Sequence, residues 1–286
     1  MKPKLSLLFF LIFGISSISA FPKNSIKIDI KGEGNPIIFI PALGCPGEMW
    51  NETVEHLSKT SKCYTISILG FGGLKSIKNS SIENIKSDII SYLKKHKIKK
   101  ATLIGHSFGG SLAIELVAAN PDLFSKLIIV DAYSFPLDVF VPGISVEIAH
   151  DEADKLYNLL LKQSEEEFKT QQETQLKEAV TDQEQFAKIL NWQINSDRNL
   201  FAITMSRMIS LDHRPELKSI KIPCLIIGTW EAFAKYGFTK ERTRMSFEDQ
   251  YKNLENHKII MAEKGRHFIM FDDPDWFMQQ IDLFLQ

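Results

Sequence analysis

Short, mostly apolar runs recur along this chain, separated by segments with helical spacing. The runs occupy residues 37–40, 64–69, 101–104, 126–130, 224–227 and 258–261. Runs of this length between turn residues are typical of strands that are buried on both faces. Apolar residues at helical spacing, most clearly over residues 82–93, lie between several of these runs. Strands that alternate with helices predict βαβ units, and therefore an α/β fold with a doubly wound, mainly parallel sheet.

A polar pair marks the start of the clearest predicted helix. Ser80 and Glu83 lie three residues apart, just at the beginning of its apolar pattern. This spacing is that of a capping box, in which the serine side chain accepts a hydrogen bond from the helix backbone. We therefore expect Ser80 to cap this helix.

The alternation of strands and helices stops after Val130. From about residue 135 to 214 the chain is polar, helical in pattern and poor in strand signals, and the alternation then resumes. A helical insertion between two strands of one sheet is typical of a lid. We therefore expect a core formed by residues 21–134 and 215–286, with a helical lid over residues 135–214.

Residues 1–20 have the composition of a targeting segment. Lys2 and Lys4 precede an apolar run over residues 5–15, and small and polar residues follow up to Ala20. This order is typical of a secretory signal peptide, which we expect to be cleaved after Ala20. The run is shorter than the roughly 20 residues that a membrane span needs. We expect a secreted or periplasmic protein with no membrane attachment after cleavage.

The charge balance disfavours nucleic acid as a partner. The 286 residues include 34 Lys and Arg and 35 Asp and Glu, for a formal net charge of −1. Such a chain has no strong long-range field to attract phosphate backbones. We therefore expect no nucleic-acid partner.

The chain has three cysteines, which is an odd number. Cys45, Cys63 and Cys224 do not have the spacing of a metal site. Because Cys63 and Cys224 lie in apolar runs, we expect both to be buried free thiols. We predict no metal site.

The most specific motif follows the apolar run at residues 101–104. Residues 105–109 read G-x-S-x-G and are followed by a predicted helix. In this setting the serine occupies a strained strand-to-helix turn that exposes its hydroxyl group. Gly105 and Gly109 leave room for the turn, because a β-carbon at either position would collide with neighbouring chain. Ser107 is therefore predicted to be a catalytic nucleophile.

A serine hydroxyl needs a base to remove its proton, and the chain has seven histidines. His106 is next to Ser107, but successive side chains diverge around such a turn, so we expect it to pack beside the turn. His267 differs from the other histidines because it follows the last apolar run. A loop at the carboxyl end of a parallel strand is where such sheets place functional groups. We therefore predict that His267 is the base.

These features resemble the α/β-hydrolase superfamily, especially its lidded esterase, C–C hydrolase and haloperoxidase branch. The resemblance rests on the motif at residues 105–110, the helical insertion, and the His267 loop before a closing helix. It extends from about residue 25 to the C-terminus. The chain order nucleophile, acid, histidine is also that of the family. The resemblance implies a serine hydrolase that uses neither a metal nor an organic cofactor.

Two segments depart from the family pattern. Residues 41–44, Pro-Ala-Leu-Gly, replace the usual His-Gly, and residues 68–72, Ile-Leu-Gly-Phe-Gly, lack the usual aspartate. Acyl transfer to the serine needs an oxyanion hole of two backbone N–H groups, and such groups tolerate changes of side chain. The resemblance therefore still implies an oxyanion hole formed by the amides of Leu43 and Phe108. Trp50, at the family's usual tryptophan position, is expected in the core.

The resemblance leaves two positions for the acid that orients His267. Glu231 follows the strand after the lid, which is the more usual position in the family, and Asp131 ends the strand before the lid. A carboxylate at the end of a buried strand would be costly without a partner, and an imidazole N–H is its natural partner. We favour Asp131 and keep Glu231 as the alternative.

The expected reaction is hydrolysis of a small-molecule ester or thioester through an acyl-serine intermediate. A fold does not determine a reaction, so a lactonase, an amidase or a C–C bond hydrolase on the same triad are alternatives. A ligand-binding receptor with vestigial turnover is a further alternative. The aromatic residues Phe135, Phe140 and Trp192 of the lid could line an acyl pocket, although their spacing also fits a core.

Overall fold

The computed structural model describes residues 24–286. The predicted signal peptide, residues 1–20, lies outside the described residues. Within the described part of the chain, no helix combines the length and the apolar character that a bilayer span requires.

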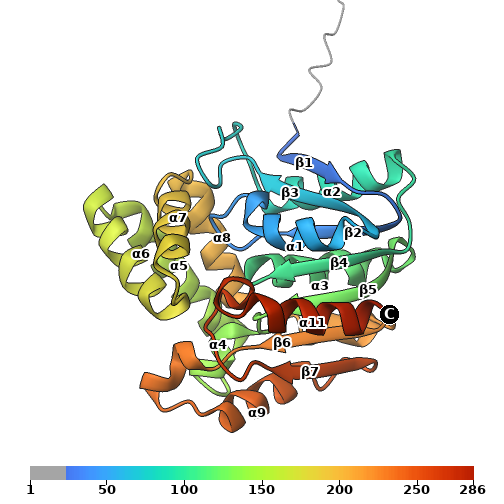
Figure 1. Ribbon diagram of the computed structural model, residues 1–286. Helices are drawn as coiled ribbons and strands as arrows, with labels where there is room; N and C mark the ends of the chain where they lie inside the picture. The colour runs from blue at the N-terminus through green and yellow to red at the C-terminus, as the bar shows by residue number, and fades with distance from the viewer. Residues whose placement is uncertain (1–23) are drawn as a thin grey trace, which may run out of the picture.

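A seven-stranded sheet forms the centre of the molecule, in the order β1-β3-β2-β4-β5-β6-β7 (Figure 1). The strands are β1 (Ile26–Lys31), β2 (Asn35–Ile40), β3 (Ser61–Ile68), β4 (Ala101–His106), β5 (Phe124–Val130), β6 (Cys224–Gly228) and β7 (His257–Met261). Only β1 runs antiparallel to its neighbour, and all other neighbouring strands are parallel. The predicted mainly parallel α/β sheet is confirmed.

Helices cover both faces of this sheet because successive residues of a buried strand point to opposite sides. Ile38 of β2 belongs to one core, whereas its neighbours Ile37 and Phe39 belong to the other. The first core includes buried residues of α2 (Ile82–Lys95), α3 (Phe108–Ala119) and α9 (Lys240–Tyr251). The second includes residues of α1 (Asn51–Leu57), α10 (Ile269–Asp272) and α11 (Pro274–Leu285). The sheet is therefore doubly wound, as predicted.

Strand β1 is absent from the predicted strands. Its sequence, Ile26-Lys-Ile-Asp-Ile-Lys, alternates apolar and polar residues. Ile26 is buried and Ile28 is partly buried, whereas Lys27 and Asp29 between and after them are exposed, as expected of an edge strand that contacts the core on one face. Such a strand has no continuous apolar run, because half of its residues are polar, and it is therefore absent from a prediction based on such runs.

The predicted cap of α2 is wrong by one residue. The N-cap is Ser81, whose backbone is extended and whose hydroxyl accepts a hydrogen bond of 3.2 Å from the N–H of Asn84. Ser80 precedes the cap, and Glu83 pairs with Lys86 at 2.9 Å. The prediction fails because two adjacent serines offer the same cap chemistry, and backbone geometry decides between them. The predicted apolar face of the helix is buried.

The segment between β5 and β6 is helical. Its helices are α4 (Pro136–Phe140), α5 (Val146–Lys162), α6 (Glu165–Ala179), α7 (Gln183–Ile194) and α8 (Arg198–Ser210). They fall within residues 135–214, the stretch expected to form a lid. In Figure 1, α5 to α8 form a group at one end of the sheet, beyond the strands. Phe168 and Phe201, with ring centroids 5.2 Å apart, join α6 to α8.

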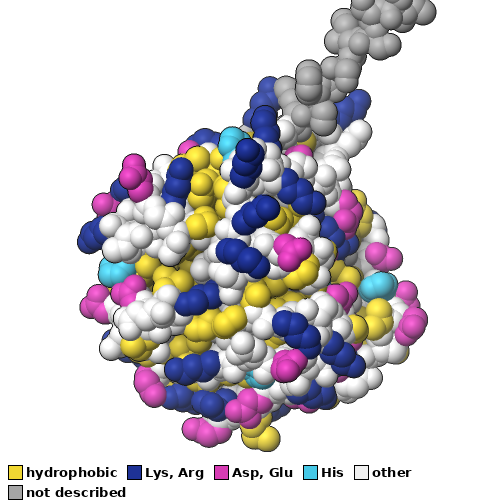
Figure 2. All heavy atoms as spheres, turned by 90° about the vertical axis from the view of Figure 1, so that its right-hand side faces the viewer, with side chains coloured by type: hydrophobic (Ala, Val, Ile, Leu, Met, Phe, Trp, Pro, Cys, Tyr) yellow, Lys and Arg dark blue, Asp and Glu magenta, His cyan; other side chains and the backbone are white. Residues whose placement is uncertain are grey.

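Positive side chains gather on the face of the molecule that is turned away from this helical group. Figure 2 shows this face, where Lys and Arg side chains lie among apolar patches. Positive side chains are therefore prominent on this face, although the formal net charge of the full sequence is −1.

The cysteines and Trp50 lie in the core. Cys45, Cys63 and Cys224 are free and buried, as predicted for the latter two. Burial raises the pKa of the Cys63 thiol to about 11 and that of Cys224 to about 12. Trp50 is completely buried and stacks on Phe277, as expected of a core residue.

Candidate active site

Ser107 lies in a sharp turn between β4 and α3. Its backbone has φ 53° and ψ −117°, a conformation that costs energy for any residue other than glycine. The turn is held by the N–H of Ser107, which donates to the carbonyl of Val130 at 2.9 Å. The carbonyl of Ser107 accepts a hydrogen bond of 3.1 Å from Ser111, so α3 begins directly after the serine. The strand–turn–helix arrangement expected from the motif is present.

Two glycines allow this turn to form. A β-carbon on Gly105 would lie 2.2 Å from the carbonyl oxygen of Gly109, and one on Gly109 would lie 2.4 Å from the carbonyl oxygen of Ile40. Both contacts involve backbone atoms, which cannot rotate away. The small residues of the motif are therefore required by the close approach of three backbone segments.

His267 and Asp131 are joined by a short hydrogen bond. Nδ1 of His267, in the loop between β7 and α10, lies 2.6 Å from Oδ2 of Asp131, directly after β5. Thr229 donates its backbone N–H and its hydroxyl to the same carboxylate, each at 2.8 Å. Asp131 is 8% exposed, so its carboxylate is buried, with three donors around it. It holds the proton of His267 on Nδ1, which leaves Nε2 free to accept another.

Glu231 occupies a different place. It begins the short 3₁₀ helix η4 (Glu231–Tyr236), and its Oε2 accepts a hydrogen bond of 2.9 Å from the N–H of Gly265. Glu231 thus supports the backbone of the loop that carries His267. Of the two alternatives for the acid, the structure brings Asp131 to the imidazole.

His106 supports the same loop from inside the protein. It is completely buried, and its Nε2 lies 2.9 Å from the carbonyl oxygen of His267. Burial holds the pKa of His106 well below 6.5, so the ring is neutral at pH 7 and its Nε2–H donates to that carbonyl. As expected, His106 packs beside the turn, with its ring centroid 4.9 Å from that of Phe268.

Ser107, Asp131 and His267 all line one cavity with a volume of about 480 Å³. This volume lies in the usual range for small-molecule sites. Most of the lining is apolar, and much of it comes from α4, α8 and η4: Phe140, Phe201, Met205, Met208, Ile209 and Phe233. The cavity can therefore hold an apolar group next to the serine hydroxyl.

Of the lid aromatics considered for this lining, only Phe140 contributes to it. Phe135 and Trp192 are buried in the core instead. Helical spacing alone does not distinguish a residue that faces the cavity from one that faces a neighbouring helix.

The residues expected to form the oxyanion hole lie in the segments that follow β2 and β4. Phe108 is the first residue of α3, where the N–H groups have no carbonyl partner within the helix. Leu43 follows β2 and lines the cavity. The two segments that depart from the family pattern contact each other, because the N–H of Gly72 donates to the carbonyl of Gly44 at 3.1 Å. The roles of Leu43 and Phe108 stay predictions that this placement permits.

Sequence reasoning missed two parts of the site. Thr229 follows β6 at the same sheet edge as Asp131, so the rule that singled out Asp131 could have found it. A hydrogen bond of 2.7 Å between Ser111 and His213 has no sequence signal, because His213 reaches the site only through the fold.

The site consists of a serine in a strained strand-to-helix turn and a histidine–aspartate pair at the same cavity. This arrangement is that of a serine hydrolase. More particularly, the chain belongs to the alpha/beta hydrolase fold family, whose model matches residues 35–282. The predicted superfamily is thereby confirmed.

Two curated relatives of this chain are named as esterases. It is 26% identical over 106 residues to a pimeloyl-[acyl-carrier protein] methyl ester esterase of Aliivibrio fischeri strain MJ11, a match that covers 37% of this chain and 40% of that enzyme. It is 25% identical over 264 residues to the esterase of the same name from Legionella pneumophila strain Corby, covering 92% of this chain and all of the other.

Solved structures show the same fold. An esterase from Exiguobacterium antarcticum superimposes with a TM-score of 0.74 and 16% identity, over 91% of this chain and 95% of that one. At this identity the similarity is evidence for the fold alone.

Proposed function

We propose that this protein is a carboxylic-ester hydrolase in which Ser107 is the nucleophile and His267 the base. The observation that carries the proposal is the 2.6 Å contact between His267 Nδ1 and Asp131, at the cavity that Ser107 lines. The names of the two curated relatives described above, both methyl ester esterases, support the same class of substrate.

The proposed reaction has two halves. In the first, Ser107 Oγ attacks the ester carbonyl carbon while His267 Nε2 takes the hydroxyl proton. The N–H groups of Leu43 and Phe108 stabilise the negative oxygen, and Asp131 stabilises the imidazolium. His267 then gives its proton to the leaving alcohol oxygen, and the C–O bond breaks to leave an acyl-serine. In the second half, water repeats the attack and releases the acid and Ser107.

A panel of p-nitrophenyl esters of increasing chain length, tested beside lactones and amides, examines this proposal. We expect the esters to be turned over, because the cavity is largely apolar and next to Ser107. Ser107→Ala should fold normally, as judged by circular dichroism, and lose about 10⁴–10⁶ of the rate. Faster turnover of lactones or amides would replace the ester assignment, and no turnover of any substrate would favour a ligand-binding receptor.

We also propose that the mature protein is secreted or periplasmic. The proposal rests on the signal-peptide pattern of residues 1–20. Mass spectrometry of protein isolated from its native host should find an N-terminus at or near Phe21. An intact Met1 on cytoplasmic material would contradict export.

A further inference from the structure

A buried hydroxyl–imidazole hydrogen bond lies at the wall of the candidate substrate cavity. Oγ of Ser111 is 2.7 Å from Nε2 of His213, and these residues are 5% and 1% exposed. Ser111 lines the same cavity as Ser107. The proposed ester hydrolysis uses neither Ser111 nor His213.

The geometry of α3 determines how far Ser111 lies from the proposed nucleophile, Ser107. It lies four positions after Ser107, which caps α3, and residues at this spacing share one face of a helix. The rise of the helix separates the two positions by about 6 Å. A substrate group that contacts Ser111 is therefore several bonds away from the carbonyl carbon that Ser107 attacks.

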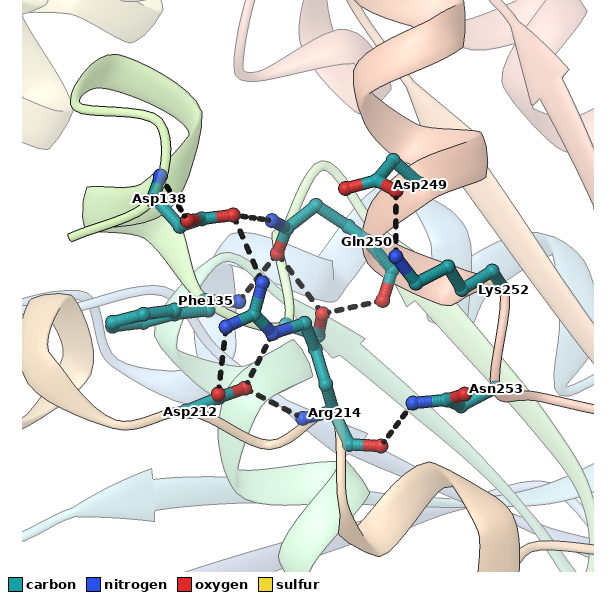
Figure 3. Close-up of polar contacts among 10 residues, drawn as sticks. Phe135, Asp138, Asp212, Arg214, Asp249, Gln250, Lys252 and Asn253 are labelled. Carbon is teal, nitrogen blue, oxygen red and sulfur yellow. Dashed lines mark hydrogen bonds and ion pairs between the residues drawn. The ribbon is translucent and has the colours of Figure 1, made fainter. Parts of the chain in front are cut away.

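A rigid polar framework holds His213 in place. The N–H of His213 donates to the carbonyl of Ser134 at 2.8 Å. Its neighbour Arg214 forms ion pairs with Asp212 at 2.8 Å and with Asp138 at 2.9 Å (Figure 3). These contacts tie the end of the helical insertion to its beginning in α4.

Gln250 of α9 extends this framework. Its side-chain oxygen accepts the N–H of Phe135 at 2.6 Å, and its amide nitrogen donates to Asp138 at 3.2 Å (Figure 3). The segment that carries His213 is thus anchored to both the insertion and the core, so His213 presents its imidazole to Ser111 in a defined position.

The pair is neutral and has unused hydrogen-bonding capacity. Burial lowers the pKa of His213, so the imidazole is uncharged at pH 7. A serine hydroxyl has one donor and two acceptor sites. With the proton of the neutral imidazole on Nε2, His213 donates to Ser111 Oγ, and the hydroxyl proton stays available for an acceptor atom of the bound molecule. A polar group in a mainly apolar cavity is costly when it stays unpaired. A polar atom of the bound molecule would remove that cost.

A second polar group in the lining of the cavity is also a donor without a partner. Gln172 of α6 lines the cavity and is 2% exposed, and its Nε2 finds no hydrogen-bond partner among residues 24–286. An amide N–H without a partner calls for an acceptor. Lys235, the cation in the lining, already pairs with Glu178 at 2.7 Å. A neutral acceptor such as a carbonyl oxygen therefore fits better than a carboxylate.

We propose that Ser111, positioned by His213, binds a carbonyl oxygen in the acyl chain of the substrate. The protein then selects acyl chains that carry a keto or similar carbonyl group over unsubstituted chains. This inference rests on the proposed esterase function, and it names Ser111 as a specificity-determining residue and His213 as its positioning residue.

The test compares ethyl hexanoate with its monoketo analogues, in which the ketone stands at successive carbons of the chain. Acid release in a pH-stat gives kcat/KM for each ester. The wild type should prefer at least one keto ester to ethyl hexanoate. Ser111→Ala should lower that preference, expressed as the ratio of the two kcat/KM values, by about tenfold, the usual effect of one hydrogen bond. A merely structural serine would change both values alike and leave the ratio unmoved.

The matched control is Ser210→Ala. Ser210 is a buried serine of α8 that donates to a carbonyl of its own helix, and its removal should leave the ratio unchanged. His213→Phe should lower the ratio as Ser111→Ala does, and the double variant should lower it no further, because the two residues act as one unit. If His213→Phe does not fold, the Ser111→Ala ratio decides alone.

The outcomes separate this inference from the function on which it rests. No hydrolysis of any of these esters by the wild type would overturn both. Hydrolysis without a preference for a keto ester, or a ratio that Ser111→Ala does not change, would overturn the role of Ser111 and leave the esterase function standing.

Discussion

Asp131 shows how much a single carboxylate depends on its place in the fold. It follows a buried strand, has an unusual positive φ of 44°, and receives hydrogen bonds from Thr229 and His267. Strain of this kind persists where the surrounding structure fixes it, often at functional sites. The sequence could place Asp131 at the sheet edge, but it could not show which carboxylate meets His267, because that depends on how the loop after β7 folds back.

Replacing each carboxylate by its amide distinguishes Asp131 from Glu231. Asp131→Asn should lower kcat by about 10²–10⁴, because His267 loses the partner that fixes its tautomer and stabilises its charge. Glu231→Gln should stay within about tenfold, since the amide can still accept from Gly265. Ester hydrolysis by the two purified variants measures this. A large loss in Glu231→Gln alone would make Glu231 the acid.

The turn between β4 and α3 is the element that the sequence predicts best. Its five-residue motif determines the local geometry, so the strand, the turn and the helix are all found where the pattern places them. Other elements are less predictable. Strand β1 is half polar, and the choice of Ser81 over Ser80 as the cap of α2 depends on backbone angles that no residue type reports.

A methyl group at Gly105 tests the close approach of backbones in that turn. Gly105→Ala places a β-carbon 2.2 Å from the carbonyl oxygen of Gly109, so it should cost on the order of 3 kcal/mol in the free energy of unfolding and abolish esterase activity. Gly143→Ala is the control. Gly143 has φ +80° but open space around its β-position, and its replacement should cost only about 1 kcal/mol. Urea unfolding gives both values. Equal stability of the two variants would show that the turn tolerates a β-carbon.

At the scale of the whole molecule, the sequence predicts the sheet, its parallel character and the position of the helical insertion. These follow from periodicity and from the order of the elements. It does not predict contacts between segments that are distant in the chain, such as Ser111 with His213 or His106 with the carbonyl of His267. Such contacts depend on how the insertion and the last loop pack on the core.

Burial of histidines in the core should make the stability of the protein sensitive to acid. The lowered pKa of His106 means that the unfolded chain binds a proton near pH 6.5 that the native chain does not. Stability is therefore retained above about pH 6.5 and falls as the pH decreases below it. From pH 7 to pH 5.5, His106 should contribute a loss on the order of 1 kcal/mol.

His106→Gln isolates this contribution, because glutamine can still donate to the carbonyl of His267 but does not titrate. Urea unfolding from pH 7 to pH 5.5 should show a smaller loss of stability for His106→Gln than for the wild type. The same pH dependence in both proteins would mean that His106 does not carry this effect.

Covalent labelling tests the central claim, that Ser107 is an activated nucleophile. The native protein is treated with a fluorophosphonate probe, and the modified residue is identified by mass spectrometry of its peptides. We expect the label on Ser107 alone, no label on heat-denatured protein, and none on Ser107→Ala, because only the folded turn and His267 activate this hydroxyl. Undiminished labelling of Ser107→Ala, or labelling of another serine in the wild type, would contradict the account.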